Sequence, residues 1–132
     1  MSNEYKDYMD DLRVDFDEKM DELYDLPDGW VNSFVPKLKE ELFDLLGSYA
    51  DDFEVLCIKE KYGRMVIYWR WADREYSNSE VVDLNNLYDK VADVINYYTD
   101  LSFVTCVVCG KKAFHRSRGW VLPYCTEHFE ND

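Results

Sequence analysis

Glycine, proline and histidine are scarce in this sequence: its 132 residues include 5 Gly, 3 Pro and 2 His. It has no phosphate-binding glycine loop, nucleophile elbow or HExxH motif, which argues against the common hydrolases and nucleotide-using enzymes. No apolar run approaches the roughly 20 residues that a membrane-spanning helix needs. The start, MSNEYKDYMD, lacks the basic and apolar regions of a signal peptide. The sequence therefore predicts a cytoplasmic protein that is not an enzyme and has no membrane partner.

Positive charge is also in short supply. Asp and Glu total 28 against 15 Lys and Arg, so the formal net charge is -13. Residues 1–26 carry ten acidic and three basic side chains, residues 27–100 fifteen and eight, and residues 101–132 three and four. We expect one compact domain in three parts: an acidic amphipathic helix (1–26), an α+β core (27–100) and a basic metal-binding module (101–132). An acidic surface repels nucleic acid and suits a partner protein with a basic surface.

Three of the 4 cysteines gather in the last segment and are followed by a histidine. Cys106, Cys109, Cys125 and His128 have the spacing C-x2-C-x15-C-x2-H, and the first pair with its following glycine is typical of a zinc knuckle. Four protein ligands leave no open position for water, so the pattern predicts a structural Zn²⁺. Two alternatives stay open: cysteines buried without metal, and His115 in place of His128. Cys57 lies alone in an apolar run and is expected to be a small buried residue.

Hydrophobic periodicity predicts three helices and one hairpin. The expected elements are helices over 3–25, 34–46 and 80–100 and strands over 53–60 and 64–71. Ser33 and Ser79 are the predicted N-caps of the second and third helices, and Gly47 is the predicted C-cap of the second. The fold class follows: α+β, with helices packed on a small antiparallel hairpin and a C-terminal treble-clef or ribbon-like zinc module.

Strict alternation along the first strand would put Phe53, Val55 and Cys57 on one face and Leu56 and Ile58 on the other. The second strand ends in an aromatic run, Tyr68-Trp69-Arg70-Trp71. Alternation separates its two tryptophans from Tyr68 and Arg70. Packing of this run against the helices, or an exposed aromatic patch for a protein partner, are the two interpretations.

The acidic face of the first helix is a candidate partner-binding surface. Its carboxylates stand about 5–6 Å apart, near the spacing of successive phosphates, so the face can imitate DNA and occupy a basic groove. The alternative is an ordinary solvated helix face. The residues proposed for this face are Asp7, Asp10, Asp11, Asp17, Glu18, Asp21 and Asp25.

Basic residues of the zinc module form a second candidate surface. Lys111, Lys112, Arg116 and Arg118 alternate with aromatic residues, a pattern that can hold phosphate and stack bases. The alternative is that these charges pair with the acidic body of the same protein. Nucleic acid is therefore the less favoured partner, and the sequence gives no oligomeric state.

Two segments resemble a family of small bacteriophage and prophage proteins. Residues 55–68 resemble the family's "vKEKFGgLRfY" stretch, and Thr105–Gly110, Gly119-Trp120 and Cys125–His128 resemble its C-terminal zinc module. Asp28-Gly29-Trp30 resembles the family's Gly-Trp entry to a helix. The resemblance implies a phage origin and a small metal-stabilised accessory protein, and it assigns no activity to any residue. We therefore expect an acidic interaction factor that binds and inhibits a host defence or DNA-handling protein; the alternative is a nucleic-acid-binding regulator.

Overall fold

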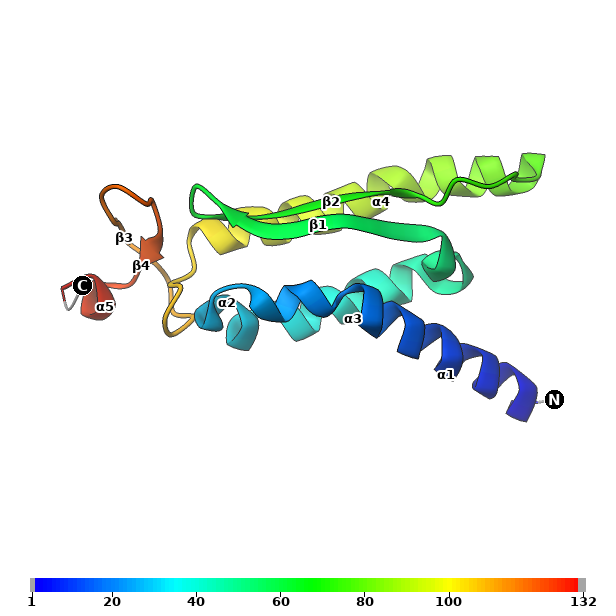
Figure 1. Cartoon of the computed structure of the whole chain (residues 1–132), viewed down its shortest axis with the longest axis horizontal. Helices are drawn as coiled ribbons and strands as arrows, with labels where there is room; N and C mark the ends of the chain where they lie inside the picture. The colour runs from blue at the N-terminus through cyan, green and yellow to red at the C-terminus, as the bar shows by residue number, and fades with distance from the viewer. Residues whose placement is uncertain (1, 131–132) are drawn as a thin grey trace.

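The computed structural model describes residues 2–130 and places a long hairpin beside helices. The hairpin strand β2 packs on α4, which also packs on α3, and the N- and C-termini lie at opposite ends of the long axis (Figure 1). This confirms the predicted α+β class, with its small antiparallel sheet and C-terminal Cys/His module. The elements are α1 (Ser2–Lys19), η1 (Asp21–Asp25), α2 (Asp28–Ser33), α3 (Val35–Leu46), η2 (Gly47–Asp52), β1 (Phe53–Lys61), β2 (Arg64–Trp71), α4 (Asn78–Phe103), β3 (His115–Arg116), β4 (Pro123–Tyr124) and α5 (Thr126–Glu130).

The first helix ends at Lys19, so the single helix predicted over 3–25 is wrong in its last part. Leu12, Phe16 and Met20 are buried at intervals of four, as an α-helix requires. After Met20 the buried residues are Leu23 and Leu26, at intervals of three. The 3₁₀ helix η1 has three residues per turn and keeps this series on one side. The change of helix type lets the chain continue to bury one apolar row.

A short helix that hydrophobic periodicity did not predict, α2, follows Pro27. Ser33 is its last residue, so the prediction of Ser33 as an N-cap is wrong. The N-cap of α3 is Phe34, whose side chain is buried and whose N–H donates to the carbonyl of Trp30. No side chain accepts a hydrogen bond at this cap, and Phe34 is held instead by burial beside Trp30, with ring centroids 6.4 Å apart. Gly47 ends α3 with φ of 54°, as predicted.

The hairpin joins β1 to β2 through Tyr62 and Gly63, both at positive φ (53° and 82°). Two such residues are the signature of a type I′ turn, whose twist matches paired strands. A bulge at Leu56 interrupts the ladder, because Val55 pairs with Trp69 and Cys57 with Tyr68. Because of this extra residue, the side chains after the bulge point to the opposite face from the one that strict alternation gives.

The predicted strict alternation therefore fails after Val55. Ile58 is buried, Leu56 is 56% exposed, and Cys57 is half-buried and not enclosed as expected. In β2 the alternation holds: Trp69 and Trp71 pack against the core, whereas Tyr68 and Arg70 are exposed. Core packing thus accounts for the two tryptophans.

The long helix α4 begins at Asn78, two residues earlier than predicted. Its N-cap is Ser77 and not Ser79, because the Ser77 hydroxyl accepts from the Glu80 N–H while the Glu80 carboxylate accepts from the Ser77 N–H. This reciprocal capping box satisfies two N–H groups at the start of the helix. None of the helices within residues 2–130 is long and apolar enough to cross a membrane.

Candidate metal centre

Four predicted ligands converge at the C-terminal end of the molecule. Cys106 and Cys109 lie in the turn after α4, Cys125 directly precedes α5, and His128 lies within it. Their ligand atoms are all within 4.8 Å of one another, and all four cysteines of the chain are free thiols. The cluster can therefore hold a metal ion.

The spacing of the ligand atoms fits a tetrahedron. Cys109 Sγ lies 3.7 Å from Cys125 Sγ, and Cys106 Sγ lies 3.6 Å from His128 Nδ1. Metal–sulfur bonds of about 2.3 Å and metal–nitrogen bonds of about 2.0 Å give tetrahedron edges of about 3.8 and 3.6 Å. Cys125 Sγ and His128 Nδ1 are closer, at 3.2 Å. A four-coordinate ion therefore fits with little adjustment of the side chains.

The turn that presents Cys106 also prepares its sulfur for a cation. Burial opposes ionisation of this thiol, but N–H groups of Cys125, Cys109 and Val108 and the His128 side chain all hydrogen-bond to it, and the net effect lowers the pKa of Cys106 to about 6. Burial raises the pKa of Cys109. Gly110 makes the turn possible with φ of 81°, and its N–H donates to the Cys106 carbonyl at 3.0 Å. Thiolate is the form that binds metal.

His115 lies outside this cluster, so it does not replace His128. Its Nε2 lies 3.1 Å from Thr126 Oγ1, and its ring stacks on that of Phe129 with centroids 4.5 Å apart. The stack holds α5 against β3. His115 therefore supports the helix that carries one ligand without reaching the ion.

A small hairpin returns the chain from the first pair of ligands to the second. Strand β3 pairs with β4, and Thr105 pairs with Lys112 in an isolated bridge. The knuckle, the hairpin and the terminal helix therefore follow one another in the order expected of a treble-clef-like module. Few apolar side chains are buried in this part, so an ion held by the cluster would be its main support.

Two residues of α2 anchor the module to the helical body. The Gly29 N–H donates to the Val107 carbonyl at 2.8 Å, and the buried Trp30 Nε1 donates to the Thr105 carbonyl at 2.9 Å. A Cβ on Gly29 would lie 2.0 Å from the Cys106 carbonyl oxygen. Only glycine lets the helix approach the knuckle so closely.

A second anchor joins the module to the hairpin turn. Trp120 Nε1 donates to Glu60 Oε1 at 2.7 Å, and the other oxygen of Glu60 accepts from the Gly63 N–H at 2.8 Å. Analysis of single motifs did not reveal either anchor. The signal was nevertheless present, because Gly29-Trp30, the segment around Glu60 and Gly119-Trp120 are the same segments that carry the phage-family resemblance.

The predicted acidic face is only partly continuous. Asp17 is half-buried and lies 3.2 Å from both Arg13 Nε and Lys39 Nζ, so it does not present a free charge. Asp21 and Asp25 lie on η1, where the α-helical projection no longer applies. The remaining members are exposed on α1: Asp7, Asp10, Asp11 and Glu18.

Three predicted acidic residues nonetheless meet at one hollow. Asp17, Glu18 and Asp21 line a surface depression of about 420 Å³ together with Val14, whose side chain is 56% exposed. An exposed valine surrounded by carboxylates is the combination that a basic side chain with an apolar stem can cover.

The predicted nucleic-acid residues differ in their surroundings. Lys111, Lys112 and Arg118 are exposed, but Arg116 is half-buried with its guanidinium 3.9 Å from the centre of the Phe103 ring. Arg116 donates hydrogen bonds to the carbonyls of His115 and Phe103. It therefore binds the end of α4 and not a carboxylate of the body.

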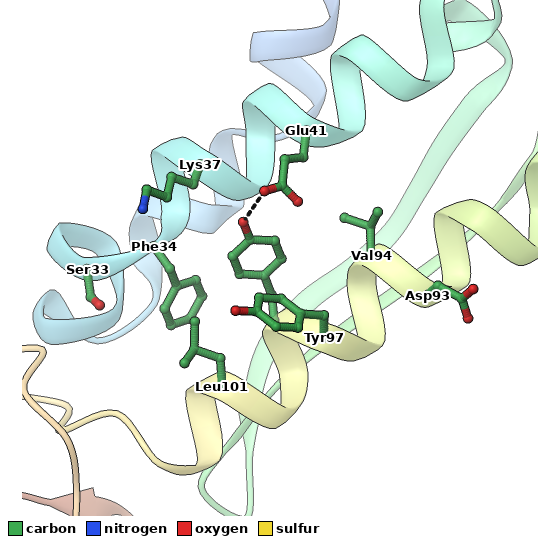
Figure 2. A pocket seen from close by; sticks show the side chains of 9 residues that line it. Ser33, Phe34, Lys37, Glu41, Asp93, Val94, Tyr97 and Leu101 are labelled. Atoms are coloured by element: carbon green, nitrogen blue, oxygen red, sulfur yellow. Dashed lines mark hydrogen bonds between the residues drawn. The ribbon is translucent and has the colours of Figure 1, made fainter.

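A pocket of about 580 Å³ lies between α3 and α4 (Figure 2). The Tyr98 hydroxyl donates to Glu41 Oε1 at 2.8 Å. The pKa of Tyr98 is raised, mainly by burial and secondly by the hydrogen bond to the Glu41 carboxylate. Tyr97 packs edge-on against Tyr98. None of the residues that line the pocket is a cysteine or histidine, and its one ordered polar contact joins the two helices. We therefore place the functional centre elsewhere.

Comparisons of this chain with models of protein families, with curated proteins and with solved structures find no match.

Proposed function

We propose that this protein is a zinc-stabilised, non-enzymatic interaction factor. Three thiolates and one imidazole form a donor set that suits Zn²⁺ better than Mg²⁺ or Ca²⁺, which prefer oxygen. The set leaves no position for substrate. The anchor from α2 binds backbone carbonyls of the metal module, and the anchor from the hairpin turn binds Trp120 in the loop of the module. These attachments to the body support a structural role for the ion.

Metal content and stability test the zinc proposal. Purified protein should hold one zinc per chain by elemental analysis, and a strong chelator should lower its midpoint of thermal unfolding. Cys109→Ser removes a ligand, whereas Cys57→Ser removes the cysteine outside the cluster and serves as a matched control. We expect zinc to be lost from the first variant alone. Full zinc content in Cys109→Ser, or absence of zinc from the wild type, would contradict the proposal.

We further propose that the acidic end of the molecule binds a protein with a basic surface. The observation that carries this is the hollow around Val14, where Asp17, Glu18 and Asp21 meet. A lysine or arginine side chain can lay its stem on the valine and bring its charge to the carboxylates of Glu18 and Asp21, which are exposed. The net charge of -13 favours the approach of such a partner over long distances.

The resemblance to small phage proteins suggests the source of the partner. We propose a host protein, of the kind that defends the cell or handles DNA, because a basic groove made for phosphates is complementary to this surface. Occupation of that groove would inhibit the host protein. No catalytic step is part of the proposal.

Charge-neutralising variants test the acidic surface. The double variant Glu18→Gln and Asp21→Asn keeps the shape of the hollow and removes two negative charges. Asp44→Asn with Asp89→Asn removes the same charge from exposed positions on α3 and α4. Partners captured from a bacterial lysate by the tagged wild type should be identified by mass spectrometry and purified. Their affinity should fall for the first double variant only; equal affinity for both would refute the surface.

A further inference from the structure

The turn between β1 and β2 and the loop of the metal module enclose a pocket of about 330 Å³. It is lined by Lys59, Glu60, Lys61, Tyr62, Gly119, Trp120 and Val121. Tyr62 and Trp120 are 75% and 70% exposed, unusually high fractions for large aromatic side chains. The two segments lie far apart in the sequence, and neither suggests a binding site alone. Together they present two aromatic rings beside two lysines.

Hydrogen bonds hold the Trp120 indole in place, and the hairpin turn fixes the backbone that carries Tyr62. Tyr62 occupies the first position of the type I′ turn, with φ of 53°, although tyrosine is a costly residue there. Trp120 is held by Glu60 through its indole N–H, and its carbonyl accepts from the Ser117 hydroxyl. Rings fixed in advance lose little entropy when a planar ligand stacks on them.

Two arginines from the same two segments, Arg64 of the hairpin and Arg116 of the metal module, form no ion pair within residues 2–130. Arg64, at the start of β2, and Arg116 both lie over the Phe103 ring, 4.3 and 3.9 Å from its centre. Burial and the neighbouring charge of Arg64 lower the pKa of Arg116. The partners of Arg116 are carbonyls, which carry no formal charge. Two like charges held on one ring leave a place where an anion is stabilising.

The acidic character of the whole chain does not extend to this place. The hairpin turn and the metal module lie at the end of the molecule that carries the C-terminus, opposite the exposed start of α1 (Figure 1). Charges further apart than the Debye length, about 8 Å at physiological salt, are largely screened. An anion that approaches this end therefore meets mainly the local lysines and arginines. Glu60, the carboxylate in the pocket, accepts hydrogen bonds from two uncharged N–H groups and keeps its single negative charge between the two lysines.

We infer that this end of the molecule binds single-stranded nucleic acid, with one unstacked base against Tyr62 and Trp120 and the phosphates beside Lys59, Lys61 and Arg64. Bases within a duplex are stacked on both faces and cannot enter such a pocket, whereas a single strand can turn one out. Exposed rings with flanking lysines recognise any base, so little sequence preference is expected. This function goes beyond the proposed protein partner and uses residues of the hairpin turn and the metal module, none of which lines the acidic hollow.

Fluorescence anisotropy of a labelled thymidine oligonucleotide of about 15 residues, a strand length that covers the ~4–16 nucleotides of known single-strand sites, tests the inference. The zinc-loaded wild type should bind the strand at low salt and bind a duplex of equal length much less tightly. Tyr62→Asn removes one ring and places the Asn-Gly pair that type I′ turns favour, so the fold is preserved. Its affinity should be about 5- to 100-fold weaker, as expected for loss of one stacked base.

Lysine variants test the phosphate contacts separately. Lys59→Gln with Lys61→Gln should reduce the slope of log affinity against log salt by about 1.4, because each phosphate contact on a single strand contributes about 0.7. Matched controls remove an exposed ring from α1, Tyr5→Asn, and exposed lysines from α3 and α4, Lys37→Gln with Lys90→Gln. These controls should bind like the wild type.

Three results would overturn the inference. The first is no change of anisotropy at low salt; the second is equal affinity for Tyr62→Asn and the wild type at unchanged zinc content. The third is binding of thymidine monophosphate as tight as that of the oligonucleotide, which would indicate a nucleotide site and not a strand site. Since the acidic hollow is unchanged in these variants, their failure leaves the proposed protein partner unaffected.

Discussion

Replacing Gly29 by alanine sets two physical effects against each other. Gly29 lies in the first turn of α2 and its φ is not in the left-handed region. Helix propensity alone therefore predicts that alanine stabilises the protein by up to about 1 kcal/mol. The new Cβ, however, would meet the Cys106 carbonyl oxygen at 2.0 Å, the Val107 carbonyl carbon at 2.7 Å and the Gly110 nitrogen at 2.8 Å. The sign of the measured change in the free energy of unfolding of Gly29→Ala shows which of the two effects is larger.

The clash should prevail because all three neighbouring atoms belong to the backbone. Overpacking that forces backbone shifts costs about 1–3 kcal/mol and sometimes more. Any shift that relieves it also lengthens the 2.8 Å hydrogen bond from the Gly29 N–H to the Val107 carbonyl, which contributes about 1 kcal/mol. After the propensity gain is subtracted, we expect a net loss of about 1–3 kcal/mol in the free energy of unfolding. Zinc affinity should fall as well, because the displaced carbonyl belongs to the first ligand, Cys106.

Urea unfolding of the zinc-loaded protein measures the first quantity, and competition with a chromophoric chelator measures the second. Asn32→Ala, on the same short helix at an exposed position, is the matched control and should change neither. A Gly29→Ala variant as stable as the wild type, with unchanged zinc affinity, would refute the close approach of α2 to the knuckle.

Three further changes test other contacts, each by urea unfolding. Trp30→Phe leaves the buried Thr105 carbonyl without its donor and should cost about 1–3 kcal/mol; a loss within error would contradict the anchor. Phe16→Ala should cost about 3–5 kcal/mol for the whole domain, whereas an independent first helix would leave the main transition unchanged. Hydrogen bonding to Arg74 lowers the pKa of Glu80 from 4.5 to about 2, so the stability that it contributes is complete above pH 4.5 and lost as the pH falls towards 2. The stability gap between wild type and Glu80→Gln should therefore narrow over that range, and a constant gap would contradict the ion pair.

The four residues of the Cys/His cluster were predictable because the pattern that brings them together is local in the sequence. Cys106 and Cys109 are joined by two residues, and so are Cys125 and His128, so each pair reaches one point whatever the rest of the chain does. The long linker between the pairs is free to form the returning hairpin. His115 was the alternative to His128, and the structure places only His128 in the cluster.

The predicted end of the first helix was wrong because α-helices and 3₁₀ helices have similar hydrophobic periodicity. Apolar residues three and four positions apart both occur in α-helices. The spacing of Met20, Leu23 and Leu26 therefore did not distinguish a 3₁₀ helix from an α-helix. The bulge at Leu56 left no trace in a run that is apolar throughout. The N-cap of α4, by contrast, could have been predicted from the sequence. Ser77 lies three residues before Glu80, which is the capping-box spacing, whereas Ser79 lies directly before Glu80.

The anchors of the metal module could not be derived from periodicity, because they join residues far apart in the chain. Trp30 and Thr105 are separated by 75 positions. Only the order of the elements brings α2 beside the turn after α4, and no motif encodes that order.

These anchors change what a metal ion in the module would stabilise. The carbonyls of Thr105 and Val107 flank the first ligand, Cys106, and they accept hydrogen bonds from Trp30 and Gly29. Trp30 is fully buried and packs near Phe34, with ring centroids 6.4 Å apart, in the core of the helical body. An ion that fixes the knuckle therefore fixes the acceptors of a core residue. Because a ligand of the folded state stabilises every part that unfolds with its site, the free energy of metal binding extends into the body. An ion bound in the module would then stabilise the folded body that holds both the charged hairpin turn and the acidic helix.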